Sequence, residues 1–102
     1  MTKLEILVGL YVKNDALYLE YRKAMTPILL GIGGDFGYDF VVGKVLKKET
    51  SNDINRVFTI RFPSKEAMDT FFSNEEYLEI KEKYYKPAVE HTTIIRSYEI
   101  TE

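Results

Sequence analysis

The order of the periodic segments is the feature that most constrains how this chain can fold. Apolar residues alternate with a period of two in residues 4–12, 36–46 and 56–62, and residues 92–100 are rich in residues that favour strands, so four strands are predicted. Between the first and second of these segments, and again between the third and fourth, apolar residues return at helical spacing. The sequence therefore predicts the order strand, helix, strand, strand, helix, strand.

Local signals mark the ends of the predicted helices. Asn14 can cap the first helix, Pro27 should kink it or loosen its last turn, and the glycine-rich residues 31–34 should end it. After the third strand, Ser64 can cap a short helix and Asn74 can cap a further one. These signals place each helix between strands, as the periodicity requires.

This order predicts the ferredoxin-like βαββαβ fold. Two right-handed crossovers, joined by a polar hairpin loop over residues 47–53, give a four-stranded antiparallel sheet in the spatial order 4-1-3-2 with the helices on one face. No linker rich in Pro, Gly or Ser divides the chain. We therefore expect one α+β domain over residues 1–102.

The sheet face away from the helices is predicted to be apolar. Leu7, Val41 and Val57 point to it by strand parity, and 45% of the residues are hydrophobic, more than one thin core needs. Soluble monomers rarely expose a large apolar patch, so a second copy of the chain is the simplest cover. We predict a homodimer that forms through this face.

Composition argues against several classes of function. The chain has no cysteine, which excludes disulfide frameworks, zinc ribbons and thiol nucleophiles, and no other cluster of metal ligands or cofactor motif is evident. A net charge of −2 argues against a nucleic-acid partner. The first apolar run contains Glu5 and is too short for a signal peptide, and no run of about 18 apolar residues could cross a membrane. We expect a cytoplasmic protein.

Strand parity also gathers polar side chains on the face away from the helices. Glu5, Asp39 and Arg61 should meet there, with Arg61 within ion-pair distance of one or both acids, and Tyr11 and Thr59 point to the same face. Such a group could bind a small polar ligand or orient an acid for proton transfer. The alternative interpretation is an ion-pair network at the dimer seam.

His91 is a further candidate for chemistry, and a set of tyrosines is predicted to pack against the sheet. His91, the only histidine, could bind a ligand or act in acid–base chemistry near neutral pH, or it could be a surface histidine at a helix-to-strand junction. The aromatic residues Tyr77, Tyr84 and Tyr85 recur at helical spacing. They should pack against the sheet with their hydroxyls at its rim.

Several short segments resemble one known family. They are Phe62-Pro63-Ser64-Lys65-Glu66-Ala67, Asn74-Glu75-Glu76-Tyr77, Tyr18-x-x-Tyr21-Arg22 and Gly33-Gly34. In this pattern the chain resembles a family of short, mostly bacterial proteins that is known only as a domain of unknown function. That family belongs to the dimeric α/β-barrel superfamily, alongside antibiotic-biosynthesis monooxygenase-like and stress-responsive barrel proteins. The resemblance implies a homodimer whose two sheets enclose a barrel, and it implies no known reaction.

Two classes of function stay open on the sequence. The first is a barrel that binds a small polar or aromatic ligand between the sheet and its partner. The second is a cofactor-independent monooxygenase- or isomerase-like enzyme. An enzyme should have a closed cavity with a titratable group pointing into it, whereas a purely structural dimer should fill that space with side chains.

Overall fold

The computed structural model describes residues 2–101. Its elements, in chain order, are β1 (Thr2–Val12), α1 (Asp15–Gly31), β2 (Asp35–Val41), β3 (Arg56–Phe62), α2 (Lys65–Ser73), α3 (Glu75–Ile80), the π-helical turn η1 (Lys81–Tyr85), α4 (Lys86–Ala88) and β4 (Val89–Thr101). The predicted order of strands and helices is confirmed. Among the described residues, no helix is both long and apolar enough to cross a membrane.

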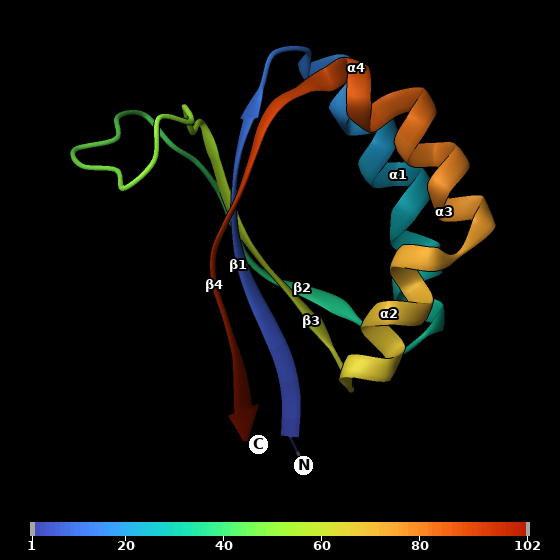
Figure 1. The fold of residues 1–102 in the computed structure, drawn as a ribbon. Coiled ribbons are helices and arrows are strands. Elements are labelled where there is room, and N and C mark those ends of the chain that lie inside the picture. The colour runs from blue at the N-terminus through green and yellow to red at the C-terminus, as the bar shows by residue number, and fades with distance from the viewer. Residues whose placement is uncertain (1, 102) are drawn as a thin grey trace.

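The four strands form one antiparallel sheet in the order β2-β3-β1-β4, which is the predicted order 4-1-3-2. All the helices cover one face of this sheet, here called the inner face, and leave the other, the outer face, without helices (Figure 1). β2 ends at Val41 and not at residue 46, so the loop to β3 spans residues 42–55 and is longer than the predicted hairpin. This loop projects from the end of the sheet (Figure 1).

The core lies between the inner face and the helices. Even-numbered residues of β1 and β3 point into it, because side chains alternate between the two faces of a strand. The largest of its fully buried side chains come from both layers: Leu10, Met25, Leu29, Phe62 and Phe71. The predicted period of two thus assigned the core face of β1 and β3 correctly.

Side-chain caps begin the helices where the sequence predicted them. Asn14 Oδ1 accepts from Leu17 N at 3.1 Å, and Ser64 Oγ accepts from Ala67 N at 3.0 Å. Asn74 caps α3 in the same way. α1 continues through Pro27 to Gly31, and Gly33 then turns the chain with a φ of 83°, a conformation that glycine adopts without strain.

A bulge in β2 changes the predicted parity of that strand. The pairing moves from Phe36 with Ile60 to Asp39 with Phe58, so β2 uses one residue more than β3. Gly37 lies at this point, where an added Cβ would collide with the Thr59 hydroxyl. That hydroxyl accepts a hydrogen bond from Tyr38 N at 2.9 Å.

The bulge corrects two predictions about faces. Asp39 was expected on the outer face, but it pairs with Phe58 and lies on the inner side. Val41 was also expected on the outer face, but it pairs with Arg56, another inner-side position. Tyr38 and Phe40 stack on each other at 5.5 Å between ring centroids, and Phe40 is opposite Val57 on the outer face.

Candidate functional site

A cavity of about 280 Å³ lies between the inner face of the sheet and the helices. Its sheet side is mostly apolar. The strand residues that line it are Ile6, Val8, Phe36, Phe58, Ile60 and Ile94, with Thr92 of β4 as the polar exception. Protein interiors are usually packed without voids larger than a water molecule. A partly open cavity of this size, between the sheet and the helices of so small a domain, is therefore the first candidate for a binding site.

The helix side of the cavity carries most of its polar groups. α1 contributes Tyr21 and Arg22, and α3 contributes Tyr77. η1 contributes Lys81 and Tyr85, one from each end of the π-helical turn. Single π-helical turns inside longer helices are rare and are often found at functional sites.

Three tyrosines form a cluster along this wall. The hydroxyls of Tyr21 and Tyr77 are hydrogen bonded at 2.9 Å, and the rings of Tyr21 and Tyr85 lie 4.9 Å apart. Tyr85 OH also bonds the hydroxyl of Thr92 on β4 at 2.5 Å.

Burial governs the protonation of this cluster. It raises the pKa of Tyr21 and of Tyr77, and it raises the pKa of Tyr85 to about 12. All three phenols therefore stay protonated at neutral pH and can donate hydrogen bonds.

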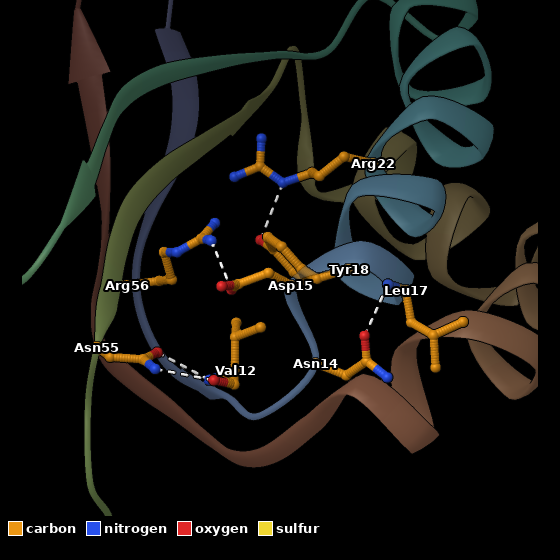
Figure 2. A network of polar contacts seen from close by, with 8 residues as sticks. All are labelled: Val12, Asn14, Asp15, Leu17, Tyr18, Arg22, Asn55 and Arg56. Atoms are coloured by element: carbon orange, nitrogen blue, oxygen red, sulfur yellow. Dashed lines mark hydrogen bonds and ion pairs between the residues drawn. The ribbon is translucent and has the colours of Figure 1, made fainter.

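Arg22 reaches from α1 toward the sheet. Its Nε donates to the hydroxyl of Tyr18, also on α1, at 2.9 Å (Figure 2). Its guanidinium carbon lies 4.0 Å from the centre of the Phe36 ring and 4.9 Å from that of Phe58. Nη2 is 3.2 Å from Asp39 Oδ2, close enough for charge attraction. This buried nitrogen nevertheless makes no hydrogen bond within the described part of the chain.

A second, polar and more open pocket adjoins the cavity at Arg22. It is lined by Asp15, Tyr18 and Asp39 together with Arg56, which bonds Asp15 at 2.9 Å. Figure 2 shows Arg22, Tyr18 and the Asp15–Arg56 pair side by side between α1 and the sheet. Arg22 lines both spaces, so its guanidinium separates the apolar cavity from a charged, more open pocket.

The predicted charged group on the outer face is only partly assembled. Glu5 and Arg61 are directly opposite on β1 and β3, as expected. Arg61 forms a two-pronged ion pair with Asp35, at 2.9 and 2.7 Å. Asp39, the acid predicted for this place, pairs with Arg22 on the other face because of the bulge. Asp35 therefore stands where Asp39 was expected.

The other predicted residues occupy two separate parts of the outer face. Thr59 lies beneath the bulge and is buried, while Glu5 accepts a hydrogen bond from Tyr98 of β4. Tyr11 and His91 are paired at the far end of β1, with ring centroids 6.3 Å apart. His91 Nδ1 accepts from the backbone N–H of Asp53 in the loop 42–55. The six predicted residues thus do not converge on one site.

Comparison with known proteins places the chain in a family. The profile of a family described as a domain of unknown function, DUF1330, matches residues 6–98. This chain belongs to the DUF1330 family. None of the curated proteins compared with the sequence matches it.

Solved structures similar to this DUF1330 chain share its fold. A protein of unknown function from Rhodopseudomonas palustris is 18% identical with a TM-score of 0.78, over 96% of this chain and 80% of that one. A dabb family protein with a ferredoxin-like fold from Mesorhizobium loti is 12% identical with a TM-score of 0.68, over 100% of this chain and 98% of that one. A hydroxynitrile lyase from Passiflora edulis is 13% identical with a TM-score of 0.68, over 98% of this chain and 94% of that one. Identities this low show the fold alone.

The residues that line the cavity of this DUF1330 chain were not recognised as a site from the sequence. Tyr21 and Arg22 were seen only as part of the family pattern, and Tyr77 was expected to hold its hydroxyl at the rim. The structure instead buries the Tyr77 hydroxyl against that of Tyr21. The available signal was chemical, because buried tyrosines need polar partners, and several tyrosines on helices that face one sheet can supply them to each other.

Proposed function

We propose that this protein binds a small, mostly apolar molecule in the cavity between the inner face of the sheet and the helices. The observation that carries the proposal is the cavity itself, about 280 Å³ with a mostly apolar sheet side and a few polar groups along one wall. An apolar cavity of roughly 150 Å³ can already hold benzene. A molecule with one aromatic ring and a short polar substituent fits this space.

This proposal moves the ligand from the place that the sequence suggested. The sequence placed it between the sheet and a partner chain, near Glu5 and Arg61. On the outer face, however, Arg61 is held by Asp35 and Thr59 is buried under the bulge. The inner cavity is the better candidate because its polar groups face an open space.

Binding is favoured over catalysis by the chemistry of the lining. The enzymatic alternative, a cofactor-independent monooxygenase or isomerase, would need a group that accepts a proton from its substrate. The tyrosines are held protonated by burial, and the described lining includes no carboxylate or imidazole. The similarity in fold to a hydroxynitrile lyase keeps catalysis as the second candidate.

We also propose that the outer face joins two copies of the chain. Tyr38 is 71% exposed and Phe40 is 52% exposed, and their rings stack. Phe40 is opposite Val57 of β3, and Leu7 of β1 points to the same face. Exposed aromatic patches of this kind usually mark interfaces. Each protomer of this dimer would keep its own inner cavity. We also propose a cytoplasmic location for the protein.

The first prediction tests the cavity by filling it. Ile94 lines the cavity from β4, so Ile94→Trp should occupy its mouth and weaken the binding of a neutral one-ring probe, acetophenone, by tenfold or more, that is, by at least ~1.4 kcal/mol. Isothermal titration calorimetry measures this change. The control is Leu30→Trp on α1, because Leu30 and Ile94 are both 58% exposed and Leu30 lies outside the cavity. No saturable binding to the wild type, or equal binding to all three proteins, would contradict the proposal.

A further inference from the structure

We propose that the ligand of the inner cavity is a small aromatic or branched aliphatic carboxylate, held by Arg22, and that Asp39 competes with it for the guanidinium. This inference rests on the proposed function, because it names the ligand class of the same cavity. It is carried by three observations: the spare hydrogen-bond donors of the wall, the incomplete pairing of Arg22, and the position of Asp39.

The wall of the cavity offers more donors than it uses. Tyr21 and Tyr77 have two hydroxyl hydrogens between them, and their mutual hydrogen bond uses one. The same holds for Tyr85 and Thr92. Arg22 and Lys81, which also line the cavity, carry only donors. A ligand that accepts several hydrogen bonds and carries negative charge matches this wall best.

Arg22 is a largely buried cation that has an unsatisfied hydrogen-bond donor among the described residues. Its guanidinium is packed among aromatic rings, and its side chain is only 17% exposed, so water reaches it poorly. Nε is bonded to Tyr18, while the buried Nη2 makes no hydrogen bond among the described residues. Guanidinium and carboxylate groups match each other in a planar, two-pronged geometry, and a buried cation gains most from such a partner.

Asp39 is a weak partner that a ligand can replace. It lies on β2, an edge strand, and its side chain is 46% exposed. It approaches Nη2 to 3.2 Å without the geometry of a hydrogen bond. The β2 bulge is what brings this acid to the inner side, where it offsets the charge of Arg22. A carboxylate inside the cavity would take over that role, and Asp39 would turn to solvent.

The test compares benzoate with the neutral probe acetophenone by calorimetry. In the wild type, benzoate should bind about tenfold more tightly than acetophenone, because a charged hydrogen bond adds to the same ring burial. Asp39→Asn removes the competitor and should tighten benzoate by about threefold or more, while acetophenone changes by less than about twofold. Asp15→Asn is the matched control, because Asp15 lines the same polar pocket but pairs with Arg56. It should leave both affinities unchanged.

Substitution of Arg22 gives the opposite result. Arg22→Gln should weaken benzoate by about tenfold and leave acetophenone within about twofold. Arg22→Lys keeps the charge but loses the planar, two-pronged geometry of the guanidinium, so its affinity for benzoate should lie between those of the wild type and Arg22→Gln. It also provides the measurement if Arg22→Gln does not fold. Benzoate binding no tighter than acetophenone in the wild type, or an Asp39→Asn variant that weakens benzoate, would overturn the inference. If acetophenone binds under those results, the proposed function stands; if neither probe binds, both proposals fail.

Discussion

At the scale of single residues, the tyrosines of the cavity wall are the most informative side chains. Each has its ring in the core and its hydroxyl against another hydroxyl, so the cluster adds polar groups without leaving an oxygen unpaired. Burial raises their pKa values, because a phenolate would be poorly solvated there. The cluster is therefore stable only while its phenols keep their protons.

Tyr85 makes this dependence measurable. Its pKa is raised from 10.0 to about 12 in the folded protein, so above pH 10 the unfolded chain loses this proton first. The stabilisation is thus fully present below pH 10 and is lost as the pH rises from 10 to 12. We predict that Tyr85→Phe makes the free energy of unfolding fall less steeply over this window. Urea denaturation at a series of pH values measures the slope.

A second variant separates titration from hydrogen bonding in this experiment. Thr92→Val removes the hydroxyl that bonds Tyr85 but keeps the phenol, so it should lower stability and still show the steep decline. Equal slopes for wild type and Tyr85→Phe would mean that another group causes the alkaline loss.

At the scale of the elements, sequence periodicity predicted the regular strands and helices correctly, but it did not predict the bulge that one extra residue makes in β2. The strand order, the inner-face residues of β1 and β3, and the caps at Asn14 and Ser64 all follow from local patterns, and they are confirmed. The β2 bulge does not follow from alternation. Gly37 was its visible signal, since an isolated glycine inside a strand often marks a bulge or a close approach of another group. Because of that bulge, Asp39 faces Arg22 and not Arg61.

The turn η1 also adds a residue, here on the helix side, and changes which side chain faces the cavity. A regular helix through α3 would bring Tyr84 to the stripe that begins at Tyr77, as the spacing predicted. The π-helical turn accommodates one more residue, so Tyr85 lines the cavity while Tyr84 lines a groove on the other side of the helix. The cavity itself was beyond sequence reasoning, because it depends on how the helix layer stands on the sheet rather than on any one segment.

At the scale of the whole molecule, the two faces of the sheet have different surroundings. The inner face is covered by helices (Figure 1) and lines the cavity. The outer face carries exposed aromatic side chains. Our proposals give ligand binding to the first and self-association to the second. The two roles can be separated by experiment, because Ile94 and Val57 lie on opposite faces of the sheet.

The dimer proposal predicts a mass of twice the 11.9 kDa chain by light scattering at micromolar concentration. Val57→Asp should shift the protein to the monomer, since it would bury an unpaired charge in the seam at a cost of several kcal/mol. Leu30→Asp on the exposed side of α1 is the control and should leave the dimer intact. A wild type that scatters as a monomer would exclude the outer face as an interface at this concentration.

The central claim is that small molecules bind in the inner cavity, and chemical-shift mapping of the ¹⁵N-labelled protein with the neutral probe acetophenone tests it most directly. We predict saturable shifts that cluster on the backbone amides around the cavity, at Ile6 and Val8 of β1, Tyr21 and Arg22 of α1, and Ile94 of β4. Shifts confined to the outer face around Glu5, Thr59 and Arg61, or no saturable shifts at millimolar acetophenone, would contradict it.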